Sequence, residues 1–428
     1  MRRSPCYDSI VLIRKGFRYR VYPSPEQEVR LGAWESALRF LWNLALEQRR
    51  MGLARPKDER VFPTAFDQIN ELTALRAELP WLADVPRNVC AQLLVELDRS
   101  WQRCFKRLAR APRWKRKGRD ALAFTEPHPK VWRLDGSTLR FPKLGGLCAV
   151  VHRLLEGKPK TCTLIRDVDQ WFAVIQCEVE VADPAPHPGP AVGIDRGVAV
   201  AFADSTGRIV ENPRFLASQA RRMARAQREA ARKKRGSKNK AEALIRVAKL
   251  HRKVRRQRDY FLHVESGYYA KNHGVVVLEK LNVRGMTASA RGAVDEPGVN
   301  VAQKRGLNRS ILDVGWSRFA DLCRYKSAWS GGEVREVVAA YSSQTCSSCG
   351  HCCKESRPSQ AVFSCVKCGH AENADVNASK VVLSRGTHGE AGCGGSATRR
   401  PAKQQLRVVR RGLRHGPELS KAPAFRPG

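Results

Sequence analysis

An alternation of apolar and polar residues over 16–22 (GFRYRVY) predicts a strand near the start of the chain. The next residues predict a helix start, because Ser24 can cap a helix, Pro25 suits its first turn and Gln27 completes a capping box. Apolar residues then follow at helical spacing, at Leu31, Trp34, Leu38 and Leu41. The chain is therefore expected to open with a strand followed directly by a helix.

Two further helices are predicted before about residue 110. One begins after Thr64 and the other after Pro86. The second carries a stripe of apolar residues on one face, formed by Val89, Leu93, Leu97, Trp101 and Phe105. Because a stripe with this period usually faces a core, we expect a helical block with these aromatic side chains buried inside it.

Short β-like runs replace the helical pattern from about residue 120 to 182. They are separated by Gly, Asp and Pro turn signals and read VWRLDGSTLRF, CTLIRDV and WFAVIQCEVEV. We expect a small β-barrel, into which the helical block is inserted. The Pro-rich segment 183–190 (DPAPHPGP) has the composition of a linker and predicts the main domain boundary.

A second pattern of strands and helices begins at residue 191. Three short strand patterns predict a meander over 191–195, 198–204 and 208–212. A long helical stretch, a buried strand, a helix and a last strand are then predicted over 214–272, 274–279, 311–328 and 333–340. Strands first, and then strands alternating with helices, favour an α/β sheet of ribonuclease H type. The tail from about 385, rich in Gly, Arg and Pro, is expected to be disordered without a partner.

Charge changes this picture more than any other feature of composition. The chain has 78 Lys and Arg against 41 Asp and Glu, a net charge of +37. Such an excess repels itself unless a polyanion neutralises it, which predicts a nucleic-acid partner. Charge alone leaves open a ribosomal or chromatin-type packing protein. No apolar run is long enough for a membrane span and the first residues lack the core of a signal peptide, so we expect a cytoplasmic, nucleoid-associated protein without a membrane partner.

Three acidic residues stand where carboxylates at strand ends could meet. Asp195 closes the strand AVGID, Glu279 closes the strand GVVVLE, and Asp375 lies just ahead of the predicted helix VNASKVVL. Neighbouring strands can bring such residues together, and clustered carboxylates suit Mg²⁺ or Mn²⁺. Two such ions can drive hydrolysis of a phosphodiester. Each residue alone could instead be a turn former or a member of a surface ion pair.

Six of the fourteen cysteines fall between 346 and 368. Two CxxC pairs there, each followed by Gly, have the spacing of a structural zinc site with the ligands Cys346, Cys349, Cys365 and Cys368. Redox CxxC chemistry is the alternative, but neither pair opens a helix after a buried strand. Cys349 and Cys352 also form a CxxC pair. We prefer Cys346 and Cys349 as the ligands, because the pattern CxxCG then occurs twice. Since Asp375 follows closely, the module should lie at the rim of the active site.

Basic residues concentrate in two segments. Residues 221–258 hold seventeen Lys or Arg against two Glu, which exceeds one helix face and predicts phosphate binding by Arg232, Lys233, Lys234, Arg235, Arg252, Lys253, Arg255 and Arg256. The segment 112–119 (PRWKRKGR) places an aromatic side chain among cations, as in sites that combine stacking with charge, and its candidates are Trp114, Lys115, Arg116 and Lys117. Trp114 could equally be a hydrophobic anchor for the loop.

The chain resembles the TnpB proteins encoded by insertion sequences, which are relatives of the type V CRISPR effector nucleases. The likeness covers most of the chain to about residue 385, in the segments FRYRVYPSPEQ, PRWKRKGR, GIDRG, LEKLNVRGM, NRSILDVGWSRFADLCRYK, SSQTCSSCGH and CGHAENADVNAS. Arg196 stands where the family often has an apolar residue. The resemblance implies that Asp195, Glu279 and Asp375 carry catalysis.

The resemblance also implies a multidomain α+β organisation. It predicts a wedge-like β-barrel (1–22 and 120–185) with a helical recognition insert (23–119), a RuvC-like nuclease domain (191–340 and 372–385), an inserted zinc ribbon (341–371) and a tail (386–428). It implies two Mg²⁺ or Mn²⁺ ions, one structural Zn²⁺, a guide RNA transcribed from the end of the element, and a double-stranded DNA target beside a short motif. Guide pairing would supply the sequence specificity.

Three other functions share some of these features. A transposase could use the same fold, but we find no separate sequence-reading helix-turn-helix. A compact type V CRISPR effector would share every motif, and only a neighbouring repeat array would distinguish it. A nuclease-dead RNA-guided repressor would be expected to lack one of the three acids, and all three are present.

Overall fold

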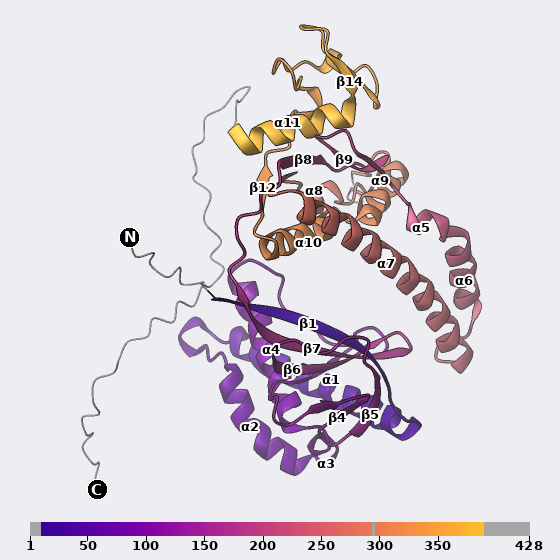
Figure 1. The fold of residues 1–428 in the computed structure, drawn as a ribbon. Coiled ribbons are helices and arrows are strands. Elements are labelled where there is room, and N and C mark those ends of the chain that lie inside the picture. The colour runs from indigo at the N-terminus through magenta and orange to yellow at the C-terminus, as the bar shows by residue number, and fades with distance from the viewer. Residues whose placement is uncertain (1–9, 293–295, 389–428) are drawn as a thin grey trace, which may run out of the picture.

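The computed structural model describes residues 10–292 and 296–388, which form two β-sheets with their helices (Figure 1). The first sheet and the helices α1 to α4 lie together, and the second sheet is surrounded by α7 to α11. The predicted tail falls almost wholly on 389–428 and so lies outside the described residues. Within the described residues, no helix combines the length and apolarity that a bilayer span requires.

The first sheet has seven strands in the order β2-β6-β7-β1-β5-β4-β3, and all neighbours are antiparallel. Its members are β1 (Ile10–Tyr22), β2 (Ala123–Glu126), β3 (Arg133–Asp135), β4 (Thr138–Phe141), β5 (Gly145–Val150), β6 (Lys158–Asp167) and β7 (Gln170–Ala182). The predicted closed barrel is wrong among these residues, because the end strands β2 and β3 do not pair with each other. They are only four and three residues long, which leaves few backbone groups for closure.

The helical block lies between β1 and β2 in the chain, as predicted. It contains α1 (Pro25–Ala54), the short 3₁₀ helix η1 (Lys57–Glu59), α2 (Ala65–Glu78), α3 (Pro80–Ala83) and α4 (Arg87–Phe105). The capping box at α1 is confirmed: Ser24 Oγ accepts a hydrogen bond from the Gln27 N–H, and Gln27 Oε1 accepts one from the Ser24 N–H. Thr64 and Asp67 form a second capping box at α2.

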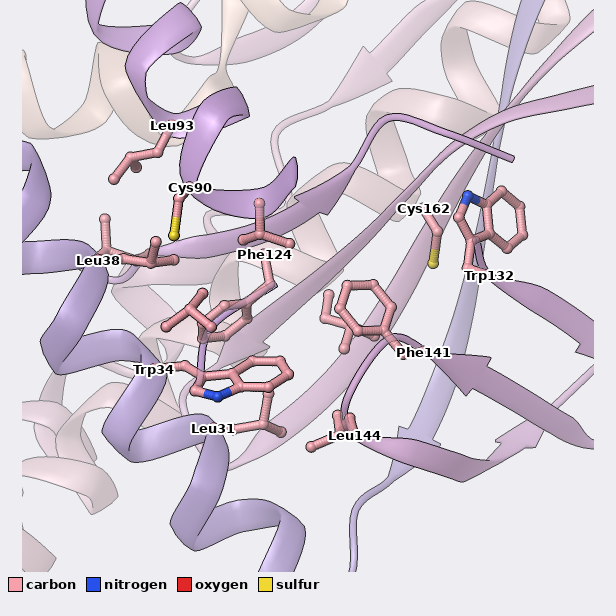
Figure 2. Packing of buried hydrophobic residues seen from close by; sticks show 14 of the residues in the cluster. Leu31, Trp34, Leu38, Cys90, Leu93, Phe124, Trp132, Phe141, Leu144 and Cys162 are labelled. Carbon is pink, nitrogen blue, oxygen red and sulfur yellow. The ribbon is translucent and has the colours of Figure 1, made fainter. Parts of the chain in front are cut away.

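One core joins the first sheet to its helices. Figure 2 shows Leu31 and Trp34 of α1 and Cys90 and Leu93 of α4 in the same cluster as the strand residues Phe124 and Phe141. The predicted burial of the aromatic stripe is confirmed for Trp34 and Trp101 and wrong for Phe105, which is 54% exposed. Phe105 is the last residue of α4 and packs at the surface against Phe62 and Trp101.

The second sheet has five strands in the order β10-β9-β8-β11-β12. The predicted meander is confirmed as β8 (Ala191–Asp195), β9 (Val200–Asp204) and β10 (Ile209–Glu211), which are antiparallel. The strands β11 (Val275–Glu279) and β12 (Glu333–Val337) are parallel to β8 and to each other. The sheet therefore combines the predicted antiparallel meander with a parallel half.

Two predicted helices are divided in the structure. The stretch 214–272 forms three helices, α5 (Phe215–Ser218), α6 (Ala220–Arg232) and α7 (Lys238–Asn272). The helix predicted over 311–328 belongs to a longer region, which the left-handed Gly315 (φ 81°) divides into α9 (Val301–Val314) and α10 (Trp316–Trp329). The short helix α8 (Val283–Met286) precedes them.

Helices cover both faces of the second sheet (Figure 1). Val192 and Ile194 of β8 pack with α7 and α10 in one core, whereas Gly193 faces α11 (Ala374–His388) on the other side. Between β12 and α11 lie the 3₁₀ helices η2 (Ser342–Gln344) and η3 (Lys354–Ser356) and the hairpin of β13 (Val362–Ser364) and β14 (Ala371–Asn373). Asp375 lies in the first turn of α11 rather than ahead of it, and α11 continues three residues past the predicted boundary at 385.

Candidate active site

Two of the three predicted acids lie at the same end of the second sheet. Asp195 is the last residue of β8 and Glu279 is the last residue of β11. The two strands are parallel neighbours with Leu278 opposite Ile194. Because parallel strands end at the same edge, both side chains start from adjacent positions there. Two residues 84 positions apart in the sequence are therefore side by side in space.

The third acid reaches this edge through the docking of α11 on β8. A Cβ added at Gly193 would lie 2.2 Å from the backbone oxygen of Ser379 and 2.6 Å from the backbone nitrogen of Leu383. The helix thus packs directly on the strand backbone, a separation that only glycine permits. At the start of the helix, Asn373 Oδ1 accepts hydrogen bonds from the backbone N–H groups of Asp375 and Val376, as an N-cap does.

All three carboxylates line one cavity of about 310 Å³. Its wall also includes Trp316 from α10 and residues of the segment that follows β12, among them Ser342 and Arg357. The cavity therefore lies where the strand ends, α10 and the four-cysteine segment meet. The structure brings together the three acids that the sequence analysis singled out.

The electrostatics of the cavity favour a bound cation. Burial and, to a smaller extent, the nearby charges of Glu279 and Asp375 together raise the pKa of Asp195 to about 8. Burial also raises the pKa of Asp375, which the Arg357 guanidinium at 3.4 Å partly offsets. Clustered and desolvated carboxylates are hard oxygen donors, and Mg²⁺ or Mn²⁺ would relieve their mutual repulsion. The residues present therefore fit divalent metal ions.

Further side chains, which the sequence analysis did not assign to the site, hold the acids in place through hydrogen bonds. Ser342 Oγ donates a hydrogen bond of 2.6 Å to Glu279 Oε1. Arg196 is buried and donates to the backbone oxygens of Glu279 and Trp316, which ties the ends of β8 and β11 to the start of α10. Ser342 lies in the segment SSQTCSSCGH, but nothing in that pattern indicates which atom the hydroxyl contacts, because the contact joins two distant parts of the chain.

Four cysteine sulfurs cluster beside this cavity. One ligand atom each from Cys346, Cys349, Cys365 and Cys368 lies within 4.8 Å of the others. The two CxxCG turns have matching geometry: Gly350 and Gly369 are left-handed, at φ 71° and 70°, and each donates its N–H to the oxygen of the first cysteine in its own turn. Thiolates arranged in this way are the donors of a tetrahedral zinc site. The cluster therefore fits one structural Zn²⁺.

The two extra cysteines are not part of this group. Cys353 Sγ contacts Glu355 Oε2 at 2.6 Å, and Cys352 pairs through its backbone with Thr345. The group of four cysteines whose ligand atoms lie within 4.8 Å of one another contains neither of them. The structure therefore brings together the four cysteines that the repeated CxxCG pattern favoured.

The basic segment between residues 221 and 258 is not one continuous helix. Lys233, Lys234 and Arg235 lie in the turn between α6 and α7, directly after Arg232, and all four side chains are exposed. The left-handed Gly236, at φ 84°, shapes that turn. The four predicted phosphate contacts thus lie at the tip of a helical hairpin.

The other basic cluster holds the two sheets together, which the sequence analysis did not predict. Arg252 is 8% exposed and donates to Asp167 O and Asp169 Oδ1, each at 2.6 Å. Arg255 and Arg256 pair with Asp167 at 2.6 and 3.4 Å. These aspartates lie at the β6–β7 turn of the first sheet, so burial and ion pairing already occupy the guanidinium of Arg252, which the sequence analysis predicted to bind phosphate. Lys253 is exposed.

The segment 112–119 packs along α1. Trp114 is 36% exposed, with the Arg50 guanidinium 5.3 Å from its ring, and the Lys115 ammonium lies 4.8 Å from the Trp42 ring. Asn43 exchanges two hydrogen bonds with the backbone of Lys115. Arg116 and Lys117 are exposed. The loop is anchored through Lys115, and part of the Trp114 ring is open to a partner.

Comparisons with known proteins place the chain among transposon-encoded proteins. The family model described as "Probable transposase" (OrfB_IS605) matches residues 174–290, and the model "Cas12f1-like, TNB domain" matches 316–382. The second match contains the four cysteines and Asp375.

Two relatives match nearly the whole chain. "Putative RNA-guided DNA endonuclease InsQ" of Escherichia coli (strain K12) is 33% identical over 398 residues, which cover 91% of this chain and 97% of that protein. A "Putative RNA-guided DNA endonuclease" of Streptomyces pristinaespiralis is 29% identical and covers 96% of this chain and 98% of its own. The chain belongs to the TnpB family.

A solved structure shares the fold. It is described as "Cryo-EM structure of the Cas12f1-sgRNA-target DNA complex", is 14% identical, and covers 87% of this chain and 99% of its own with a TM-score of 0.51. At this identity the likeness concerns the fold alone.

A third family model, described as "Helix-turn-helix domain", matches residues 13–56. The sequence analysis found no such motif. The structure has the strand β1 and the single helix α1 over these residues rather than two helices joined by a turn. The family description and the observed structure therefore differ for this segment.

Proposed function

We propose that this chain is an RNA-guided DNA endonuclease that hydrolyses phosphodiester bonds at the cavity formed by Asp195, Glu279 and Asp375. The observation that carries the proposal is the meeting of these three acids, from three separate segments, in one partly desolvated cavity. Membership of a family whose members bear this activity in their names supports the choice of substrate.

The three carboxylates would hold two Mg²⁺ or Mn²⁺ ions. Such ions, when bound, lower the pKa of a coordinated water and neutralise charge on the phosphate. Asp195 and Glu279 would present their oxygens from fixed strand ends, and Asp375 would present its carboxylate from the first turn of α11. The four cysteines would hold one Zn²⁺, which would stabilise the segment beside the cavity rather than react.

The strand arrangement supports a RuvC-like domain of ribonuclease H type over 191–340 and 372–388. Three antiparallel strands precede two parallel ones, and Asp195 and Glu279 stand at the ends of the neighbouring strands β8 and β11. We assign 10–22 and 120–185 to a wedge-like domain, 23–119 to its helical recognition insert and 341–371 to the zinc-binding module.

Recognition of the target would divide between nucleic acid and protein. Guide RNA would pair with the target strand and set the sequence, while exposed cations such as those at the α6–α7 turn would contact phosphates. A short motif beside the target would be recognised by the N-terminal half.

The proposal is tested by purifying the chain with its bound RNA, sequencing that RNA, and supplying DNA that matches the guide segment. We expect Mg²⁺-dependent cleavage of the matched duplex and none of a scrambled duplex. Copurification of no specific RNA, or equal cleavage of both duplexes, would contradict it. A neighbouring repeat array would instead favour a compact type V CRISPR effector with the same chemistry.

A further inference from the structure

The four-cysteine cluster and the carboxylate cavity share one short segment of chain, residues 342–347. Cys346 of the cluster lies inside it, and Ser342 lies four residues earlier. Ser342 Oγ is 2.6 Å from Glu279 Oε1, and both residues are 5% exposed. A contact this short between buried groups fixes the carboxylate as well as the serine.

The serine hydroxyl has one proton and two acceptors within reach. Glu279 Oε1 is at 2.6 Å and the backbone oxygen of Ala339 is at 3.1 Å. The shorter of the two bonds goes to the Glu279 side chain. A donor held on one carboxylate oxygen sets the rotation of the carboxylate plane, and that rotation decides where its metal-binding lone pairs point.

The other end of the same segment is tied to the helix that carries Asp375. Asn377 lies two residues after Asp375 on α11 and is fully buried. Its Nδ2 donates to the backbone oxygen of Thr345 at 2.8 Å, and its Oδ1 accepts from the backbone N–H of Ser347 at 2.9 Å. Both backbone groups flank Cys346. The first cysteine turn is therefore clamped to α11 by one side chain that satisfies two backbone groups.

We propose that Ser342 and Asn377 are positioning residues through which the zinc-binding module sets the geometry of the cleavage site. Ser342 orients the Glu279 carboxylate, and Asn377 fixes α11, and with it Asp375, to the turn that contains Cys346. The inference rests on the proposed function, because it concerns the same carboxylates. Groups that orient metal-binding side chains from behind typically contribute about 10- to 100-fold to metal affinity or activity.

The test titrates Mn²⁺ into the full-length RNA-free protein by calorimetry, with the heat of an Asp195→Ala variant subtracted as the blank. Ser342→Ala is compared with Ser342→Thr, which keeps the hydroxyl, and with Ser348→Ala, which alters an exposed serine of the same module. Zinc content is measured for each by elemental analysis.

We expect Ser342→Ala to weaken Mn²⁺ binding about tenfold or more while one zinc is retained. Ser342→Thr should recover most of the affinity, and Ser348→Ala should match the wild type. The Mn²⁺ concentration for half-maximal cleavage should rise by a similar factor in Ser342→Ala. Wild-type Mn²⁺ affinity and an unchanged Mn²⁺ dependence in that variant would overturn the role of Ser342.

Asn377→Ala provides an independent arm that remains informative if Ser342→Ala does not fold. We expect it to weaken Mn²⁺ binding as well, because α11 would lose its attachment beside Asp375, and wild-type Mn²⁺ affinity would overturn the proposal. Failure of the proposed function gives a different result: wild type and Asp195→Ala would then show the same heats, with no Mn²⁺ site to perturb.

Discussion

The three acids of the cavity belong to three separate segments, and each is predicted to be indispensable. Asp195→Ala, Glu279→Ala and Asp375→Ala should each reduce cleavage by about 10²–10³-fold or more, because each removes a carboxylate that would hold the metal ions, and these ions would stabilise the charge on the reacting phosphate. Guide and target binding should persist, since the exposed cations are elsewhere. The measurement is cleavage of a matched duplex at saturating Mg²⁺, beside gel-shift binding.

Asp321→Ala is the matched control for these three variants, because Asp321 is an exposed carboxylate paired with Arg324 on the surface of α10. It should cleave as the wild type does. Near wild-type cleavage by any of the three cavity variants would remove that residue from the site.

The cysteines allow an equally direct comparison. Cys365→Ser should release zinc and destabilise residues 341–371, because the free energy of metal binding contributes to folding in such modules. Cys353→Ser should retain one zinc per chain, because Cys353 contacts Glu355 rather than the cluster. Elemental analysis of the two purified variants checks both statements, and zinc loss from Cys353→Ser would mean that the ligand set is different.

For single residues, the sequence could indicate which side chains are candidates for catalysis and metal binding. It could not indicate which other side chains hold them in place. The acids and the four cysteines stand in recognisable local patterns. The groups behind them act across long separations: Ser342 reaches Glu279 over 63 positions, and Arg196 reaches Trp316 over 120. Such partners depend on how elements pack, so no local periodicity reveals them.

Among the elements, α11 and β8 make the contact on which the assembly of the cavity depends. Gly193→Ala should destabilise the protein by about 1–3 kcal/mol, because the added methyl group would overlap the backbone of α11 and force it away from the strand. Thermal unfolding and cleavage should both suffer, since Asp375 moves with the helix.

Gly16→Ala is the matched control for that substitution. Gly16 also lies in a strand, but a Cβ there meets nothing within 4 Å. This variant should unfold near the wild-type temperature. Equal stability of the two alanine variants would show that α11 does not pack on β8 as closely as described.

Element boundaries followed from sequence where local chemistry decides them. The helix starts predicted after Ser24 and Thr64 are confirmed, and at each of them a capping box forms hydrogen bonds within four residues. The open ends of the first sheet depend on packing between distant strands, whereas the break at Gly315 is a local left-handed C-cap whose N–H bonds to Ile311 O. Helical periodicity continues across such breaks, which is why one helix was predicted where two are present.

Across the whole molecule, the basic residues divide into those that join the two halves and those that remain open to a partner. Arg252 pairs with Asp169 at the β6–β7 turn, whereas four other cations are exposed: Arg232, Lys233, Lys234 and Arg235. The amino-acid composition could predict an excess of positive charge but not this division. The division depends on which Lys and Arg side chains form ion pairs with carboxylates in the folded chain.

Neutralising the four exposed cations together should weaken RNA or heteroduplex binding without changing the sequence that is cut. If four phosphate contacts are lost, the slope of log affinity against log salt should become shallower by about three to four units. Filter binding over a salt series measures the slope, and sequencing of cleavage products measures the specificity. An unchanged slope would mark the turn as a solvated surface, and a shifted cleavage sequence would mean that it contacts bases.

The place of Asp375 on α11 also has a consequence during synthesis of the protein. Asp375 follows Asp195 by 180 residues (375 − 195), so at about 5–20 residues per second the ribosome needs about 9–36 s to add the third acid after the first. The first sheet and its helical insert, which end before residue 191, can fold during this interval. A chain interrupted before α11 would lack Asp375, the third acid of the cavity, and we expect such a chain not to cleave DNA.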